Sequence, residues 1–219
     1  MDTSEPQTER RVGIVVDAFA KHTPAASRAL VVRFLATLRQ WNKKLDLTAA
    51  KTEDELVDLF VADAALLAGM LGPGQRVCDV GAGAGAPGFV LALLRPDLQL
   101  TLVEPLAKRT SFLRTFWATH AAAHAPSLRL WLEPVATALA RADRFDVAVS
   151  RATFEPAVWL DTGRALLRPA QPNVDAPFVV LLHAKEDAPL GPPGLERAEG
   201  QRYVWPLTQR ERQLTRYSG

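Results

Sequence analysis

The sequence predicts an α/β protein, with a mostly parallel sheet covered by helices on both faces and a helical extension at its N-terminus. Up to residue 72, apolar side chains recur at three- and four-residue spacing, as they do in one-sided helices. After Gly74, short apolar runs alternate with helical stretches, which is typical of parallel strands joined by helices. A glycine-rich loop follows the first of these runs. We therefore expect a helical extension over residues 1–72, packed on a main domain over residues 73–219.

The individual elements follow from the same patterns. The N-terminal pattern runs from Val12 to Leu47, and His22-Thr23-Pro24 is expected to divide it into two helices because proline interrupts a helix. A third helix is predicted over Glu53–Leu71. The predicted strands are Gln75–Asp79, Leu98–Glu104, Leu128–Leu132, Phe145–Ser150 and Phe178–His183. The helices predicted between them are Phe89–Leu94, Lys108–Ala122 and Glu155–Leu167.

The C-terminal part has a weaker pattern. Asp187–Glu199 contains three prolines and two glycines and is predicted to be an exposed connection, followed by a last strand near Tyr203–Leu207. The tail carries Arg210, Arg212 and Arg216, which either close the edge of the sheet or are solvated.

Length and composition allow one sizeable core, or one core with a small appendage, because 48% of the 219 residues are hydrophobic. The net charge of +2 is a weak argument for nucleic acid, although local clusters of Arg and Lys leave room for a basic surface. The single cysteine, Cys78, excludes an internal disulfide and indicates a reducing compartment. No apolar stretch is long enough to span a membrane, and the acidic N-terminus does not resemble a secretory signal. We expect a cytoplasmic protein that does not bind membranes.

The loop from Gly81 to Gly88 is the strongest local signal, because it joins a predicted strand to a predicted helix. Gly81, Gly83 and Gly85 let the backbone turn tightly and approach a ligand closely. With Ala86 the loop also satisfies a loose dinucleotide fingerprint, so alone it does not distinguish a nicotinamide cofactor from S-adenosylmethionine. A tight turn that binds no ligand is the plain alternative.

Two carboxylates flank this loop. Asp79 ends the first predicted strand, where it can face the cationic end of a cofactor or orient the loop. Glu104 ends the second, where a carboxylate can accept hydrogen bonds from both hydroxyls of a ribose. This arrangement favours an adenosyl cofactor.

Four stretches carry a resemblance to a known family: Trp41–Thr48 (WNKKLDLT), Asp79–Gly88 (DVGAGAGAPG), Glu104–Leu113 (EPLAKRTSFL) and Ser150–Ala152 (SRA). In this order and near this spacing they resemble the RsmG (GidB) family of bacterial guanine-N7 methyltransferases of small-subunit ribosomal RNA. The resemblance implies a Rossmann-like class I S-adenosylmethionine-dependent methyltransferase fold with an N-terminal helical extension. It further implies S-adenosyl-L-methionine as cofactor and ribosomal RNA or the small ribosomal subunit as partner, and we expect a monomer.

The resemblance also assigns roles by position. It implies cofactor contacts for Gly81, Ala86, Glu104, Ala136, Thr137 and Arg151, to which the loop adds Asp79, Gly83 and Gly85. It implies RNA contacts for Lys108 and Arg109 and makes Arg151 and Lys185 the candidate catalytic residues, as donors to the O6 and N7 edge of guanine. Because N7 has a lone pair and no proton to remove, we expect catalysis by positioning and electrostatics without a strong base.

Two positions depart from the family pattern. Phe60 stands where the family usually has a histidine, three residues before the aspartate that matches Asp63, and Thr137 stands where it usually has an acidic residue. An altered or inactive relative that binds RNA and a methyltransferase of small molecules therefore stay open as alternatives. An oxidoreductase is disfavoured because no Tyr-x-x-x-Lys pair is present.

Other candidate sites have plainer interpretations. His120 and His124 share a predicted helix face but have no acidic third ligand nearby, so we expect no metal site. Lys108 and Arg109 can be a solvated helix start, although positive charge there opposes the helix dipole and favours a phosphate partner. Arg151 can form an ion pair with Glu155.

Overall fold

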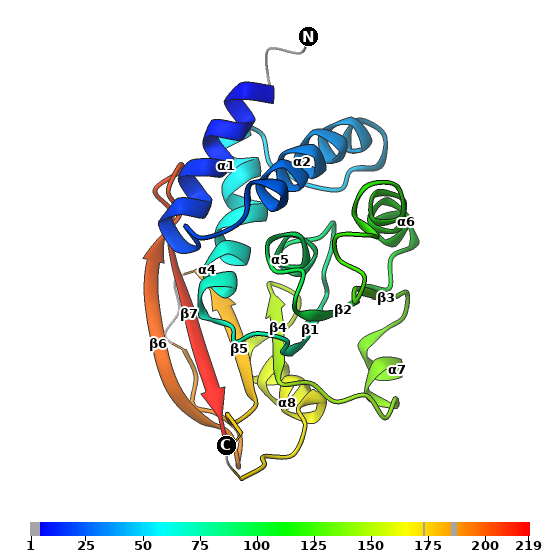
Figure 1. The fold of residues 1–219 in the computed structure, drawn as a ribbon. Helices are drawn as coiled ribbons and strands as arrows, with labels where there is room; N and C mark the ends of the chain where they lie inside the picture. Colours follow the sequence, from blue (N-terminus) through cyan, green and yellow to red (C-terminus); the bar gives the residue numbers. More distant parts are fainter. Residues whose placement is uncertain (1–4, 173, 185–187) are drawn as a thin grey trace.

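The fold is organised around a mixed sheet whose strands run in the order β3-β2-β1-β4-β5-β7-β6 (Figure 1). The computed structural model describes residues 5–172, 174–184 and 188–219. The first five strands pair in parallel, and β7 pairs antiparallel with both β5 and β6. The sheet is therefore parallel apart from one C-terminal hairpin.

The described elements have the following bounds. The strands are β1 (Arg76–Val80), β2 (Gln99–Val103), β3 (Arg129–Trp131), β4 (Val147–Arg151), β5 (Phe178–His183), β6 (Glu196–Val204) and β7 (Glu211–Ser218). The α-helices are α1 (Glu5–Phe19), α2 (Ala25–Leu45), α3 (Glu53–Val57), α4 (Asp63–Met70), α5 (Gly88–Leu94), α6 (Ala107–Phe116), α7 (Val135–Leu139) and α8 (Pro156–Leu166). Two π-helical turns, η1 (Asp58–Ala62) and η2 (Trp117–Ala121), continue α3 and α6.

Most sequence predictions are confirmed. All five predicted parallel strands are present, and α1 and α2 are separated at the segment that contains Pro24. The predicted third helix corresponds to α3, η1 and α4, which follow one another without interruption. The short helix α7, which follows β3, was not predicted.

The C-terminal prediction was wrong. The expected connection Asp187–Glu199 overlaps β6, and the last strand is β7 rather than Tyr203–Leu207. The tail arginines do not close the sheet edge, because β7 lies between β5 and β6. The physical reason is that β6 is an edge strand with mostly exposed, polar side chains, so the apolar alternation that reveals other strands is missing.

Helices cover both faces of the sheet (Figure 1). One large core cluster joins side chains of α1, α2, α4, α5 and α6 to one face, and a smaller cluster joins α7 and α8 to the other. The Phe34 ring of α2 stacks on Phe89 of α5 with ring centroids 5.2 Å apart. The N-terminal helices thus share a core with the sheet, and the division at residue 72 stays an interpretation. No helix in the described part of the chain is long and apolar enough to cross a membrane.

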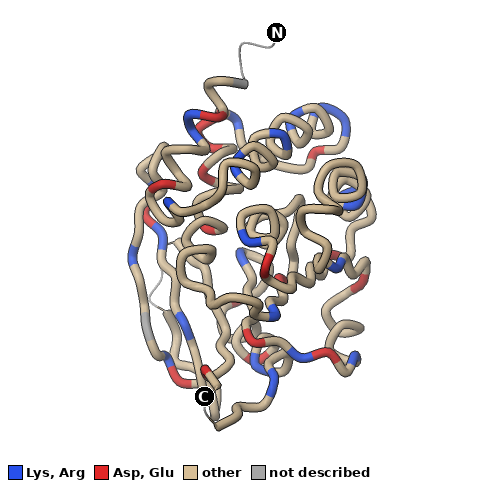
Figure 2. The backbone as a smooth tube through the Cα atoms, in the orientation of Figure 1, with Lys and Arg blue, Asp and Glu red and all other residues tan. Residues whose placement is uncertain are grey.

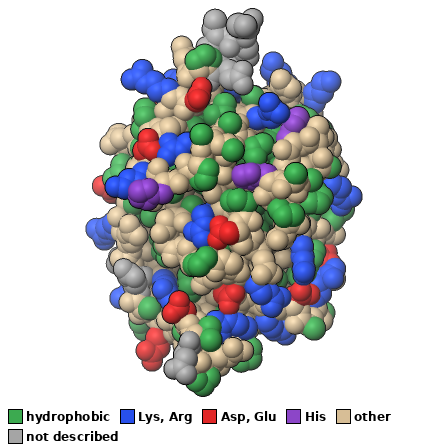
Figure 3. Space-filling view, viewed as in Figure 1, with side chains coloured by type: hydrophobic (Ala, Val, Ile, Leu, Met, Phe, Trp, Pro, Cys, Tyr) green, Lys and Arg blue, Asp and Glu red, His purple; other side chains and the backbone are tan. Residues whose placement is uncertain are grey.

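Charges are spread widely over the surface. On the face shown in Figure 3, basic, acidic and apolar side chains are interspersed. Basic positions recur along the C-terminal hairpin (Figure 2), where they include Arg197, Arg202, Arg212 and Arg216. Net charge therefore does not by itself mark a nucleic-acid surface.

Candidate active site at the carboxyl edge of the sheet

The candidate site lies where β1, β2 and β4 end side by side. In the parallel register, Asp79 of β1 pairs with Leu102 of β2 and with Val149 of β4. Glu104 and Arg151 therefore lie at the same edge as the glycine loop, which begins at Gly81. Open α/β sheets place their ligands beyond this edge.

The glycine loop needs a left-handed backbone, with φ of 76° at Gly81, 58° at Gly83 and 112° at Gly85. The Gly81 amide donates to the Val103 carbonyl at 2.8 Å, which fixes the loop to the end of β2. A side chain at Gly81 would collide with Thr153, and one at Gly85 would press on core side chains that include Phe34. A side chain at Gly83 would enter open space, with its nearest atom 3.9 Å away.

The surroundings that an added side chain would meet differ among the glycines of the loop and indicate different roles. Gly83 is the one whose missing side chain leaves room for a ligand, whereas Gly85 faces the core. The Gly85 amide donates to the Ala82 carbonyl at 2.8 Å, and Ala86 is buried beside it. The cofactor contacts of Gly85 and Ala86 stay predictions, and their observed contacts serve the turn.

Asp79 is fully buried directly beneath the loop. Its Oδ2 accepts a hydrogen bond from the Gly88 amide at 2.8 Å, at the start of α5. Its Oδ1 is buried without a hydrogen-bond partner among the described residues. Burial raises the pKa of Asp79 to about 7, against the lowering effects of the Gly88 amide and Arg151. A buried carboxylate oxygen of this kind is stabilised by a cationic or donor group of a ligand.

Glu104 is 3% exposed and closes the loop from the other side. Its Oε2 accepts from the Gly83 amide at 2.8 Å, and its Oε1 accepts from the Leu106 amide at 2.9 Å. Oε2 also accepts a long bond from Arg109, whereas Oε1 keeps a second lone pair that can accept a bond from a ribose hydroxyl. The orphaned Asp79 oxygen, the open side of Gly83 and the anchored Glu104 together fit a cofactor that carries both a ribose and a positive charge.

Two other residues that are predicted to contact the cofactor are more exposed than Asp79 and Glu104. Ala136 and Thr137 are exposed on α7, directly after β3. Their contacts with a cofactor stay predictions.

Lys108 and Arg109 both use protein groups as partners. The Lys108 ammonium donates to the carbonyls of Leu45 and Asp46 at 3.1 and 3.2 Å, at the C-terminus of α2. Arg109 donates to Glu104 at 3.5 Å. Lys108 thus stabilises the end of a helix. Arg109 bonds Glu104, the carboxylate that is predicted to bind the ribose. The RNA contacts of Lys108 and Arg109 stay predictions.

Arg151 is the last residue of β4. The alternative prediction that it forms an ion pair with Glu155 is wrong, because its carboxylate partner is Asp63. The Arg151 Nη1 donates to the Leu59 carbonyl at 2.6 Å and to Asp63 Oδ2 at 3.0 Å. Leu59 belongs to the π-helical turn η1, a feature that is frequent at functional sites. Both bonds use Nη1, so Nε and Nη2 make no hydrogen bond within the described chain and remain available to a ligand.

Asp63 organises a pocket that sequence reasoning missed. Its Oδ1 accepts from the Tyr203 hydroxyl at 2.7 Å and from Trp205 Nε1 at 2.9 Å, while Oδ2 accepts from Arg151. The pocket has a volume of about 200 Å³, and its lining includes Arg151, Tyr203, Trp205 and Arg212. The available signal was an acidic residue inside an apolar helix, because such a carboxylate needs buried donors.

A second buried carboxylate, Asp58, joins the same helix to the turn after β6. Asp58 accepts from the Leu207 amide, from the Thr208 amide at 2.7 Å and from the Thr208 hydroxyl at 2.8 Å. Burial raises the pKa of Asp58. Asp58 and Asp63 therefore connect the N-terminal helices to the C-terminal hairpin.

The remaining sequence candidates lie apart from this pocket or outside the described residues. Phe60 is 3% exposed and packs near Phe34, so it contributes no atom to the pocket lining. His124 lies 2.9 Å from the Leu93 carbonyl, and His120 packs against the Phe116 ring. Lys185 lies outside the described residues, although Ala184 just before it lines the pocket.

The sheet order, with helices on both faces, is the fold of class I S-adenosylmethionine-dependent methyltransferases. TrmN of Thermus thermophilus has a similar fold, with a TM-score of 0.52 and 16% identity over 85% of this chain and 48% of that one. Fibrillarin of Aeropyrum pernix, solved with natively bound S-adenosyl-L-methionine, has a TM-score of 0.50 and 14% identity over 74% of this chain and 75% of its own. At these identities the likeness concerns the fold.

Sequence comparisons identify the family. The chain belongs to the GidB family, rRNA small subunit methyltransferase G, whose model matches residues 27–172. Ribosomal RNA small subunit methyltransferase G of Chromohalobacter salexigens is 33% identical over 167 residues, which cover 74% of this chain and 75% of the relative. The protein of the same name from Anaeromyxobacter sp. is 30% identical over 201 residues, or 89% of this chain and 90% of the relative. The resemblance seen in the sequence is confirmed, and the cofactor is S-adenosyl-L-methionine.

Proposed function

We propose that this chain transfers the methyl group of S-adenosylmethionine to N7 of a guanine in small-subunit ribosomal RNA, and that the Asp63–Arg151 pocket receives that guanine. The observation that carries the assignment of the pocket is Arg151. Its guanidinium is fixed at the end of β4 by Asp63 and the Leu59 carbonyl, with two of its nitrogens left to donate. A guanidinium held in this way matches the O6 and N7 acceptors of guanine.

The cofactor, when bound, supplies an electrophilic methyl group on a sulfonium. We assign its ribose hydroxyls to Glu104 and its positively charged end to Asp79, whose Oδ1 has no other partner in the described chain. The Gly83 backbone then lies against the cofactor, because a side chain there would enter the open space beside the loop.

The residues of this chain act mainly by positioning. Since N7 carries a lone pair, no residue has to remove a proton before transfer. Arg151 orients the base edge and stabilises the charge distribution of the transition state, while Asp63 keeps the guanidinium from rotating. Lys185 is proposed as a second donor from the segment that follows β5.

The test combines binding and transfer. Titration calorimetry should detect S-adenosylmethionine and no nicotinamide dinucleotide, and a labelled methyl group should then appear in small-subunit ribosomal RNA. RNA binding without transfer would identify an altered or inactive relative. Cofactor binding without any interaction with RNA would favour a small-molecule substrate. Either outcome would overturn the proposal.

The cellular setting follows from the proposed substrate. Action on ribosomal RNA or on the small ribosomal subunit implies a cytoplasmic enzyme. We propose that it acts as a monomer, with all of the assigned groups contributed by one chain, which gel filtration with light scattering would check.

A further inference from the structure

The pocket beside Arg151 contains a second guanidinium that family membership does not assign. Arg212 lies in β7 and lines the pocket together with Arg151 and Asp63. Its guanidinium carbon lies over the Trp205 ring, 4.0 Å from the ring centre, where the face of the indole attracts the positive charge. Trp205 is itself 2% exposed and is fixed by its bond to Asp63.

Among the described residues, Arg212 is attracted by Asp63, but Asp63 is already paired with Arg151. Asp63 is bonded by Arg151 and by two neutral donors, and Arg210 forms an ion pair with Glu55 at 2.6 Å. Besides the Trp205 ring, the contact that the Arg212 guanidinium makes within the described residues is the Glu211 carbonyl, at 2.8 Å. Burial lowers the pKa of Arg212, which reflects loss of water around a charge that remains positive. The described part of the pocket therefore carries one excess positive charge.

A half-buried guanidinium that shares one carboxylate with a second guanidinium is complementary to an anion. A guanine base is neutral, whereas each phosphodiester of RNA carries one negative charge. A guanidinium stacked on an indole presents its N–H donors at its edge, in the geometry that binds two phosphate oxygens. Arg151, which is already paired with Asp63, is therefore assigned to the edge of the neutral guanine. Arg212 is assigned to the RNA backbone.

We propose that Arg212, held on Trp205, binds the phosphodiester next to the target guanine and so anchors the RNA backbone at the mouth of the pocket. This inference rests on the proposed function, because it concerns how the same RNA is held. Arg212 is a binding residue and makes the same contact before and during methyl transfer.

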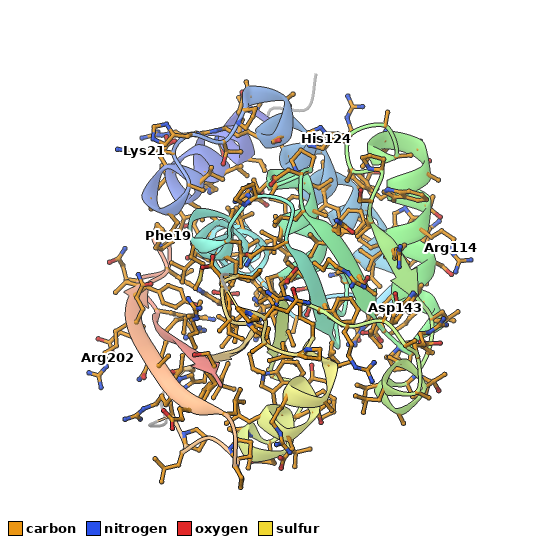
Figure 4. The ribbon with its side chains drawn as sticks, turned by 60° about the horizontal axis from the view of Figure 1, so that its bottom comes forward. Phe19, Lys21, Arg114, His124, Asp143 and Arg202 are labelled. Atoms are coloured by element: carbon orange, nitrogen blue, oxygen red, sulfur yellow. The ribbon has the colours of Figure 1, made fainter. Side chains whose placement is uncertain are left out.

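The experiment compares Arg212→Gln with a matched control, Arg202→Gln. Arg202 is one residue from Tyr203 on β6, is exposed, and points away from the molecule (Figure 4). Arg212→Gln should raise the KM for ribosomal RNA about tenfold, with kcat and the Kd of S-adenosylmethionine unchanged. The slope of log affinity against log salt should fall by about 0.7–0.9, the loss of one phosphate contact. Arg202→Gln should change the KM less than twofold.

A second variant keeps the test independent of folding. Arg212→Met retains an unbranched chain that can cover the indole, and it should show the same change in KM and salt slope. The inference would be overturned if both Arg212 variants methylate RNA with the wild-type KM and slope. It would also be overturned if they relax the choice of nucleotide while the salt slope stays unchanged, because that result indicates a base contact. Failure of the wild-type chain to methylate RNA would instead contradict the proposed function.

Discussion

Replacement of Asp63 by asparagine tests the organisation of the site most sharply. Asp63 is 1% exposed, and its two oxygens accept bonds from Arg151, Tyr203 and Trp205. An asparagine at this position would keep the shape and one acceptor for Tyr203 and Trp205. Its amide nitrogen would then face the Arg151 guanidinium, which is also a donor. The variant therefore removes the ion pair while preserving packing.

The expected cost follows from this geometry. Removal of one partner from a buried ion pair costs about 3–5 kcal/mol, because the other charge is left without compensation. Arg151 has a side chain 19% exposed and keeps the Leu59 carbonyl, so we expect a loss at or just below the lower end of that range, about 2–3 kcal/mol. In a chain of this size that corresponds to a fall in Tm of about 4–12 °C.

Urea unfolding of wild type, Asp63→Asn, Arg151→Met and the double variant measures both the loss and the coupling between the two residues. Asp161→Asn is the control, since Asp161 is 65% exposed and lies 4.0 Å from Arg164, and it should change stability by less than about 0.5 kcal/mol. The Asp63–Arg151 coupling should reach at least about 1 kcal/mol. Additive losses, or an Asp63→Asn variant as stable as the control, would refute the reasoning.

Three further perturbations address the cofactor and substrate contacts. Because burial raises the pKa of Asp79 from 3.8 to about 7, the folded protein holds a proton that the unfolded chain has released, and stability is lost as pH rises across that interval. The free energy of unfolding of Asp79→Asn, measured relative to wild type, should therefore rise from pH 4 to pH 7 by at most about 4 kcal/mol and stay constant above pH 7. A difference that does not depend on pH would contradict the raised pKa of Asp79. Gly83→Val should abolish S-adenosylmethionine binding in calorimetry, whereas Gly74→Val, with the same left-handed backbone and open surroundings, should lose only about 1–2 kcal/mol of stability and bind normally. Arg151→Lys should lower the rate of methyl transfer about tenfold or more, since one ammonium cannot bond Asp63, the Leu59 carbonyl and a guanine edge together; single-turnover kinetics at wild-type rate would remove Arg151 from the guanine contact.

The sequence predicted the parallel part of the fold because those strands are buried on both faces and stand out as apolar runs. Val147, Ala148 and Val149, for example, are fully buried in β4. The same logic failed at β6, an edge strand whose pattern is polar. In β7, Arg212 and Arg216 lie over aromatic rings. Judged by residue type alone, this segment resembles a charged, solvated tail.

The sequence also predicted that Asp79, Glu104 and Arg151 lie at strand ends, but it did not predict the partners of Arg151. Asp79, Glu104 and Arg151 are each adjacent to a strand end, so local pattern was sufficient to place them. The partner of Arg151 is Asp63, 88 residues earlier, and that of Asp63 is Tyr203, 140 residues later. Such pairs depend on how the helices and the hairpin pack, which periodicity within one segment cannot predict.

Cleavage mapping of N7-methylguanine tests the central claim most directly. Small-subunit ribosomal RNA that lacks the modification would be incubated with the purified chain and S-adenosylmethionine, then treated so that the strand breaks at each N7-methylguanine. We expect one new break that requires both the cofactor and the wild-type chain and that is strongly reduced with Arg151→Ala. A chain that binds S-adenosylmethionine but produces no break, or that methylates a different atom of the RNA, would contradict the account.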